Sequence, residues 1–204
     1  MERQPHLVKW DTVIKDKSSG GLGLRSMRQL NTTFLMKLGW RLNSEPIALW
    51  ARILKEKYCR GRDMNSLADR RISCSNAWRG ILETRDLLNQ GLGIAIGDGQ
   101  QTEFWNKKWL DGKILAQQAA QPISEEHQLK RVSDYWQPGM GWDWTQLSAA
   151  LPTEIIKRIA SFELVEDEVG DKLIWLGNSA GKFDIKSAIN LLHPLNSSNN
   201  GEWK

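Results

Sequence analysis

Basic side chains that gather in short clusters are the residues best suited to contact a charged ligand. The largest gathering begins inside a predicted helix and continues past its end, and it consists of Lys55, Lys57, Arg60, Arg62, Arg70 and Arg71. Lysine and arginine neutralise nucleic-acid phosphates without reading the bases, so this cluster is the candidate nucleic-acid-binding site. The alternative is a solvated face of mixed charge, and composition alone favours that plainer interpretation.

Groups able to catalyse a reaction or hold a metal do not converge in the sequence. Cys59 and Cys74 form no CxxC pair, and the three histidines are scattered. The acidic run at residues 166–168 is local, whereas two-metal nuclease sites need several convergent carboxylates. The glycines of residues 20–23 lack the Lys-Ser/Thr ending of a phosphate-binding loop, so a turn before a helix explains them better. We therefore predict no catalytic residue, no metal and no cofactor.

The charge of the 204-residue chain is divided unevenly. Residues 1–114 hold 20 Lys and Arg against 12 Asp and Glu, whereas residues 115–204 hold 8 against 12. Only the first part therefore suits a polyanion. The N-terminal residues lack the apolar core of a signal peptide, and no stretch approaches the ~20 apolar residues of a membrane span. We expect an intracellular protein of the cytoplasm or nucleus, without a membrane partner.

Tryptophan is unusually frequent, with eleven Trp against two Tyr and four Phe. Such side chains serve either as core residues or as platforms on which nucleic-acid bases stack. Several lie at helical spacing within apolar stretches, which favours the core for most of them. Trp40, Trp50 and Trp78 fall in three predicted helices, and we expect all three to be buried.

Hydrophobic periodicity predicts an α-rich α+β fold with two small helical units and two short β-hairpins. The first helix starts at Arg25, a second starts at a Ser44 cap and ends near Tyr58, and a third starts at Ser75 or Asn76 and stops at Gly91. The predicted segments are an extended N-terminal segment (1–24), a helical bundle (25–91), a β-hairpin (92–112), an irregular connector (113–141), helices plus a second hairpin (142–193) and a disordered tail (194–204).

Both hairpins are predicted from turn signals between alternating residues. In the first, residues 93–96 and 102–105 flank a Gly-Asp-Gly turn at residues 97–99. In the second, residues 172–175 and 182–184 flank the segment Asn-Ser-Ala-Gly. Asp184 is then the expected cap of a final helix.

The order of short motifs resembles one stretch of plant LINE-type (non-LTR) retrotransposon polyproteins. Six motifs in order carry the resemblance: Trp10-Asp11 with Gly20-Gly21-Leu22-Gly23-Leu24; Asn31 to Trp40-Arg41-Leu42; Leu49-Trp50-Ala51-Arg52-Ile53-Leu54-Lys55-Glu56-Lys57-Tyr58; Ala77-Trp78-Arg79-Gly80-Ile81-Leu82; Ile96-Gly97-Asp98-Gly99 to Phe104-Trp105 and Trp109-Leu110; and Asp171-Lys172-Leu173-Ile174-Trp175 to Gly181-Lys182-Phe183-Asp184-Ile185-Lys186-Ser187-Ala188. Departures are the missing basic residues at Ala95 and Gln101, Lys108 in place of a frequent proline, and Asp184 in place of a usual serine.

The resemblance implies a connector between the reverse-transcriptase palm and the zinc-binding and ribonuclease H segments. It implies that the chemistry of the RNA-directed DNA polymerase lies outside these residues, since no Tyr-x-Asp-Asp-like segment occurs. The implied partners are RNA or DNA backbone and adjoining polyprotein domains. Two alternatives stay open: a domesticated or degenerate protein-interaction module without nucleic-acid binding, and a remnant without selected function.

Overall fold

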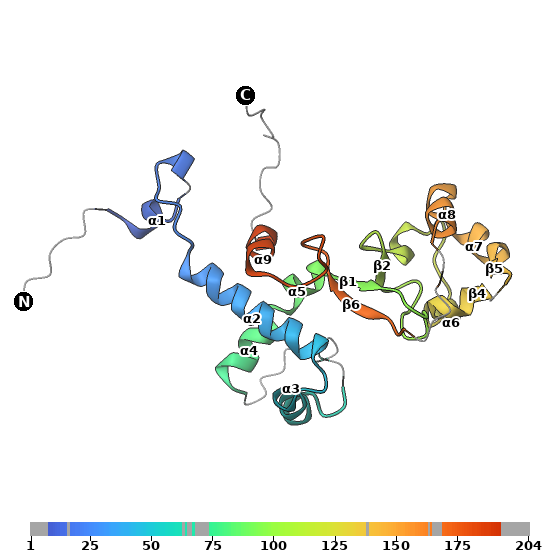
Figure 1. The fold of residues 1–204 in the computed structure, drawn as a ribbon, viewed down its shortest axis with the longest axis horizontal. Coiled ribbons are helices and arrows are strands. Elements are labelled where there is room, and N and C mark those ends of the chain that lie inside the picture. The colour runs from blue at the N-terminus through green and yellow to red at the C-terminus, as the bar shows by residue number, and fades with distance from the viewer. Residues whose placement is uncertain are drawn as a thin grey trace, which may run out of the picture. The chain divides into compact units, whose positions relative to one another are not determined.

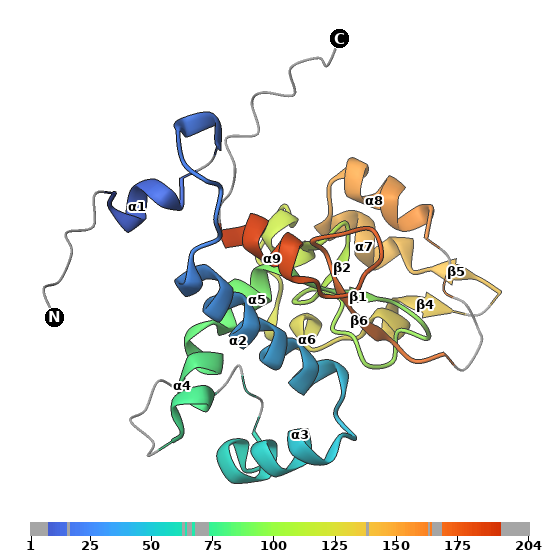
Figure 2. The same ribbon diagram turned by 60° about the vertical axis from the view of Figure 1, so that its left-hand side comes forward.

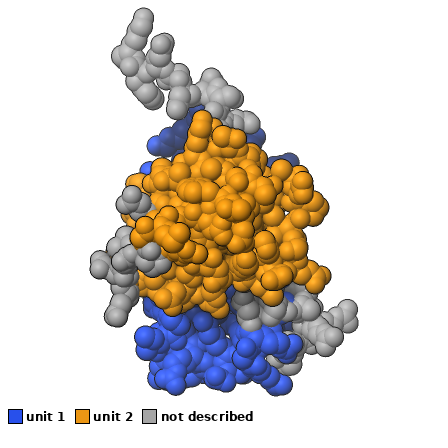
Figure 3. Space-filling view, turned by 90° about the vertical axis from the view of Figure 1, so that its right-hand side faces the viewer, with its two compact units in different colours: residues 1–88, 184–204 blue, residues 89–183 orange. Residues whose placement is uncertain are grey.

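The computed structural model describes most of the chain (Figure 1, Figure 2), namely residues 8–15, 17–62, 64, 67, 74–137, 139–162, 164 and 169–192. The chain forms two compact units, one from residues 1–88 with 184–204 and the other from residues 89–183 (Figure 3). The predicted disordered tail, 194–204, lies outside the described residues. The predicted segment boundaries stay predictions.

The first unit is helical in its described part. Its elements are α1 (Trp10–Val13), the 3-10 helix η1 (Lys17–Ser19), α2 (Met27–Ser44), α3 (Leu49–Leu54), the π-helix η2 (Lys55–Cys59), α4 (Asn76–Glu83), the first part of α5 (Arg85–Gly91) and α9 (Ile185–Leu192). The prediction of an extended segment before residue 25 is wrong for the residues that form α1 and η1. Backbone hydrogen bonds fold this segment back on itself, because Leu22 N–H donates to Val13 O at 3.0 Å and Gly23 N–H to Lys15 O at 2.9 Å.

Helix α2 is the longest element of the first unit, and its predicted start near residue 25 is confirmed. It packs against α4 and α9, and two glycines allow close approach of its neighbours. A Cβ added to Gly39 would lie 2.9 Å from Leu88 Cδ2, and one added to Gly80 would lie 2.8 Å from Leu35 Cδ1. These glycines therefore set the spacing between α2 and the helices beside it.

The second predicted helix starts later than expected. Ser44 is the last residue of α2, and Glu45 N–H donates to Arg41 O at 2.8 Å. The Glu45 carboxylate also accepts two hydrogen bonds of 2.9 Å from the Arg41 guanidinium, which holds the chain beyond the helix end. The next helix begins only at Leu49, so the predicted cap at Ser44 is wrong.

The third predicted helix is confirmed at both ends. Ser75 Oγ accepts a 3.3 Å hydrogen bond from Trp78 N–H, which caps α4. Thr84 separates α4 from α5, and α5 ends at Gly91 as predicted. Asp184 likewise caps α9, since its Oδ1 accepts a 2.8 Å hydrogen bond from Ser187 N–H.

The second unit combines short helices with small sheets. Its described elements are β1 (Leu92–Ala95), β2 (Lys108–Leu110), β3 (Lys113–Ile114), η4 (Leu115–Gln118), α6 (Glu125–Gln128), η5 (Val132–Tyr135), β4 (Trp136–Gln137), β5 (Gly141–Trp142), α7 (Trp144–Ala150), α8 (Thr153–Ala160) and β6 (Lys172–Trp175). Its three sheets are two-stranded and antiparallel, so the predicted α-rich α+β class is confirmed. The predicted connector at 113–141 is less irregular than expected, because it contains β3, η4, α6, η5 and β4.

Strand β1 does not turn back on its sequence neighbours. It pairs with β6, with Leu92 opposite Trp175 and Ala95 opposite Lys172. The predicted hairpin across residues 97–99 is therefore wrong. The return arm of the second predicted hairpin, residues 182–184, forms no strand, although Trp175 N–H donates to Gly181 O at 2.8 Å and closes the turn.

A single carboxylate explains why the Gly-Asp-Gly segment is not a hairpin turn. Asp171 Oδ1 accepts hydrogen bonds from the N–H groups of Gly97 at 2.8 Å and Gly99 at 3.0 Å. Its Oδ2 accepts from Gln101 N–H at 3.2 Å and from Thr102 Oγ1 at 2.6 Å. The loop thus wraps a side chain about seventy residues away, which links two of the six sequence motifs.

Two true hairpins lie elsewhere in the second unit. The β2–β3 hairpin turns at Asp111 and Gly112, whose φ angles of 50° and 67° are the paired positive values of a type I′ turn. The β4–β5 hairpin pairs Trp136 with Trp142. The described residues therefore contain two short hairpins, but not at the predicted positions.

Aromatic side chains fill the core of the second unit. Phe104 contacts its aromatic neighbours at ring-centroid distances of 4.5 Å to Tyr135, 5.0 Å to Trp105 and 5.3 Å to Trp109. The buried indole of Trp105 donates to Tyr135 Oη at 2.9 Å, and that of Trp109 donates to Phe104 O at 2.8 Å. Burial with a hydrogen-bond partner is how a core accommodates tryptophan, so most of these residues are structural as predicted.

The three tryptophans of the first unit's helices differ in burial. Trp78 is buried as predicted, whereas Trp40 and Trp50 are only half-buried. Trp50 lies under the Arg41 guanidinium, whose carbon is 5.3 Å from the ring centroid, and this contact covers part of its surface. The expectation of full burial is therefore confirmed only for Trp78.

Candidate nucleic-acid interface

The candidate site lies on the continuous helical segment formed by α3 and η2. Ala51, Tyr58 and Cys59 are buried, and Trp50 and Leu54 pack partly against the same core. Burial of this face turns the charged side chains of the segment outward. Lys57 is exposed and Lys55 is half-buried.

The second half of this segment is a π-helix, which ends in a left-handed residue. Arg60 N–H donates to Lys55 O, five residues back, at 3.1 Å. Arg60 then adopts φ 49° and ψ 51°, and Gly61 follows at φ 77°. A non-glycine residue in this region is uncommon and costs free energy. The backbone thus reverses at a place that presents Arg60 and Arg62, both exposed.

A stacked pair of aromatic rings anchors the π-helix η2 to the core. Tyr58 lies against Trp78 at 4.7 Å between ring centroids and 18° between planes. Ser75 N–H donates to Tyr58 Oη at 3.3 Å, and Lys57 Nζ lies 5.2 Å from the centroid of the tyrosine ring. Hydrogen bonding with Ser75, assisted by the Lys57 ammonium, lowers the pKa of the Tyr58 phenol. These contacts fix the position from which Lys57 and Arg60 project.

The chain beyond the turn is held by Arg85. Its Nη1 donates to the carbonyl oxygens of Met64 at 3.2 Å and Leu67 at 2.8 Å. Met64 and Leu67 are themselves buried. The segment that follows the candidate cations is therefore attached to the core at its described residues.

The structure brings four of the six predicted cations together. Lys55, Lys57, Arg60 and Arg62 occupy eight consecutive positions, and within the described residues none of them forms an ion pair. Arg70 and Arg71 lie outside the described residues. Glu56 is the acidic residue within the helical segment, so the surface is predominantly cationic.

Sequence reasoning did not foresee the apolar side chains beside these cations. Leu49 and Ile53 are exposed on the same helical segment. The buried face instead follows Ala51, Leu54 and Tyr58. Spacing of three and four fits both rows, so the sequence did not distinguish them.

The other polar groups of the described residues show no arrangement for holding a metal ion. Among the residues with described positions, no group of three or more His, Cys, Asp or Glu side chains is arranged to hold a metal ion. The Asp171 carboxylate is occupied by its four hydrogen-bond donors. None of the helices in the described part is both long enough and apolar enough to cross a bilayer.

Comparison with known proteins finds relatives in one plant. No family model and no solved structure matches the sequence. The chain is 34% identical to a protein of Arabidopsis thaliana named "Putative ribonuclease H protein" over 196 residues, which are 94% of this chain and 31% of that protein. It is 35% identical to an uncharacterised mitochondrial protein of Arabidopsis thaliana over 112 residues, which are 53% of this chain and 71% of that protein. The chain thus spans about a third of the first relative.

Proposed function

This chain belongs to the same plant protein family as that mitochondrial protein of Arabidopsis thaliana, and from its six sequence motifs we propose that it is a connecting segment of a LINE-type retrotransposon reverse transcriptase. In this role it contacts the phosphate backbone of RNA or DNA and performs no chemistry itself. The similarity of 94% of the chain to part of a longer protein named for ribonuclease H supports the assignment. The polymerase and ribonuclease activities then belong to other parts of the longer protein.

The cationic turn, formed by Lys55, Lys57, Arg60 and Arg62, carries this proposal. These four cations lack ion-pair partners among the described residues, yet the turn beneath them is anchored by the Tyr58 stack. Cations on an anchored backbone lose less conformational entropy when they meet phosphates than cations on a mobile loop do. No base-reading motif is present in the sequence, so the contact should be independent of nucleotide sequence.

A purely structural role for the same cations makes a different prediction. Lysine and arginine near a helix C-terminus interact favourably with the helix dipole, typically by about 0.3–1 kcal/mol each. If that were their whole role, reversing their charge would lower stability and leave nucleic-acid binding unchanged. Stability and binding therefore have to be measured on the same variants.

The test is the salt dependence of binding to mixed-sequence RNA and DNA. The variant Lys57→Glu/Arg60→Glu/Arg62→Glu should weaken binding. It should also make the plot of log binding constant against log salt concentration less steep, by about 2 to 3 in the magnitude of its slope, since each phosphate that is no longer neutralised reduces that magnitude by about 0.7 to 0.9. The matched control, Arg28→Glu/Lys37→Glu/Arg79→Glu, makes the same change in net charge at exposed positions elsewhere in the first unit.

Two results would count against the proposal. Equal reductions of binding in both variants would mean that overall charge, and not the cationic turn, drives binding. An unchanged slope in the first variant, with a lowered free energy of unfolding, would assign these cations to helix stabilisation alone.

A further inference from the structure

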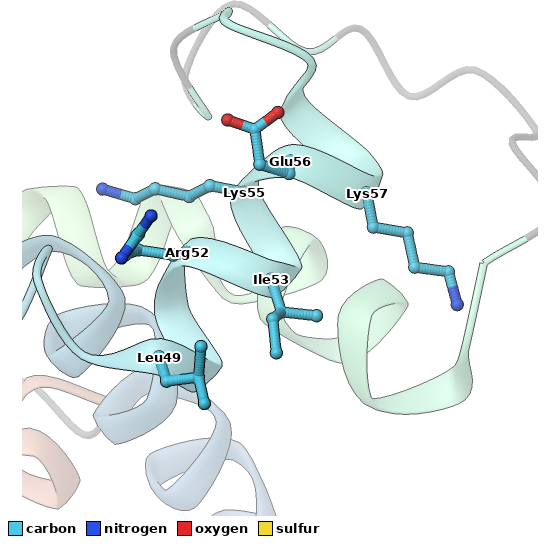
Figure 4. Close-up of a pocket in the computed structure, with 6 residues that line it drawn as sticks. All are labelled: Leu49, Arg52, Ile53, Lys55, Glu56 and Lys57. Atoms are coloured by element: carbon cyan, nitrogen blue, oxygen red, sulfur yellow. The ribbon is translucent and has the colours of Figure 1, made fainter.

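A groove of about 640 Å³ opens on the outer face of α3 and η2 (Figure 4), lined by Leu49, Arg52, Ile53, Lys55, Glu56 and Lys57. In this view Leu49 and Ile53 point the same way, Arg52 and Lys55 extend to one side, and Lys57 extends to the other. The groove therefore has an apolar floor between cationic edges. It belongs wholly to the first unit.

The apolar floor is not explained by contact with nucleic-acid backbone. Leu49 is 70% exposed and Ile53 is 55% exposed, and the nearby Ile47 is 87% exposed. Phosphates and sugars would leave these aliphatic side chains without apolar contacts, and the groove offers no aromatic ring on which a base could stack. Burial of aliphatic surface requires an aliphatic or aromatic partner.

The charges at the edges define the rest of the partner. Arg52 and Lys57 are exposed, Lys55 is half-buried, and Glu56 is the single acidic group in the lining. A cationic edge around an apolar floor complements a helix that carries apolar side chains on one face and carboxylates beside them. The α-helical part of the lining, residues 49–54, rises about 8 Å at 1.5 Å per residue. The π-helix η2 extends it, so the lining is long enough for one to two turns of a partner helix.

We propose that this groove binds an acidic amphipathic helix of a protein partner. Leu49 and Ile53 receive its apolar face, and Arg52, Lys55 and Lys57 meet its carboxylates. The inference goes beyond nucleic-acid contact, because it rests on the apolar floor and not on Arg60 and Arg62. Apolar positions spaced by three or four residues and flanked by Glu or Asp define the partner's sequence pattern.

The first experiment uses a fluorescently labelled, end-capped peptide of about 18 residues, or five helical turns, in which Leu recurs at helical spacing and Glu fills the adjoining positions. Fluorescence anisotropy measures its binding to the full chain. A scrambled peptide of the same composition is the control for charge. We expect the helical peptide to bind about tenfold more tightly, since only its leucines can reach the floor together. Equal binding of the two peptides would overturn the proposal.

The second experiment removes the floor. Leu49→Ser/Ile53→Ser should weaken peptide binding by about tenfold or more, whereas Leu22→Ser/Leu24→Ser, at other exposed leucines of the first unit, should leave it unchanged. Because all four side chains are exposed, circular dichroism should show that both variants keep the parent fold. Equal effects of the two variants would overturn the proposal.

The third experiment separates this groove from the nucleic-acid interface. Single-stranded RNA should bind Leu49→Ser/Ile53→Ser as tightly as it binds the parent chain. Arg52→Glu/Lys55→Glu should weaken binding of the acidic peptide and strengthen binding of a matched peptide in which Lys replaces Glu. If Leu49→Ser/Ile53→Ser weakens RNA binding by the same factor as it weakens peptide binding, the groove is a nucleic-acid site and the helix proposal fails. Failure of the peptide binding alone would leave the cationic-turn proposal standing.

Discussion

Replacing Arg60 with glycine should make the first unit more stable while weakening its contact with nucleic acid. The left-handed backbone of Arg60, with φ 49° and ψ 51°, costs a non-glycine residue about 1–2 kcal/mol. Glycine removes that cost, but it also raises the conformational entropy of the unfolded chain, which lowers the free energy of unfolding by about 0.4–1 kcal/mol. The exposed side chain makes no ion pair among the described residues, so little packing is removed. The net gain should be about 0.5–1 kcal/mol.

Urea unfolding followed by circular dichroism measures this gain, and a salt titration of RNA binding measures the weakened contact. Arg60→Gly should lower the log–log salt slope by about 0.7 to 0.9. Arg62→Gly is the matched control, because it removes the same charge from a residue whose φ is not positive. It should lower the slope similarly and reduce stability, since glycine gains nothing there. If Arg60→Gly is no more stable than Arg62→Gly, the left-handed residue stores no strain and the reasoning fails.

Four further outcomes test the core, the carboxylate loop and the assignment of chemistry. Trp78→Ala should cost about 3–5 kcal/mol, because it removes a buried ring stacked on Tyr58, and a reduction below about 1 kcal/mol in urea unfolding would contradict that packing. Asp171→Asn should destabilise the second unit by about 1.5–3 kcal/mol, since an amide cannot accept all the hydrogen bonds that the carboxylate accepts; hydrogen exchange of the 97–102 amides measures the effect. Gly97→Ala should destabilise the same unit by about 1–3 kcal/mol or more, because its Cβ would overlap the carbonyl oxygen of Val169, and an unchanged melting temperature would refute the close approach. The purified chain should neither incorporate nucleotides nor cut RNA, and a metal-dependent activity that copurifies with it and disappears when one of its residues is mutated would disprove the proposed non-catalytic role.

Local patterns predicted the helices better than the strands. The hydrophobic period from Arg25 onward located α2. Side-chain type alone predicted a cap at Ser75 or Asn76 and one at Asp184, and the structure has Ser75 and Asp184 in these positions. Each of these features depends on residues within one or two helical turns, where spacing and side-chain type carry the information.

The strand errors have two different physical causes. Gly97 to Gly99 has the composition of a hairpin turn, but the loop is organised by Asp171, which no local window contains. The true type I′ turn at Asp111-Gly112 was overlooked, although Asp-Gly between apolar residues is the strongest short-range signal for a hairpin. The first error could not be avoided from local pattern, whereas the second could.

The candidate site was predicted in part. The cationic cluster around Lys57 and Arg60 was visible because its members are neighbours in the sequence. The π-helix η2 was not predicted, because one extra residue in a helical turn hardly changes the spacing of the apolar residues. The exposure of Leu49 and Ile53 was not foreseen either, because it depends on which of two equivalent rows packs against the core.

The pairing of β1 with β6 has a consequence for synthesis on the ribosome. Residues 92–95 emerge long before residues 172–175, with which they pair. Helix α2 likewise cannot pack against α9 until residues 185–192 have been synthesised. Contacts of such high sequence separation slow folding, because the intervening chain must lose entropy before they form. Neither unit can be completed on a nascent chain that stops before Asp171. A stop codon or frameshift before the codon of Asp171 would therefore damage both units, including the one formed mostly from early residues.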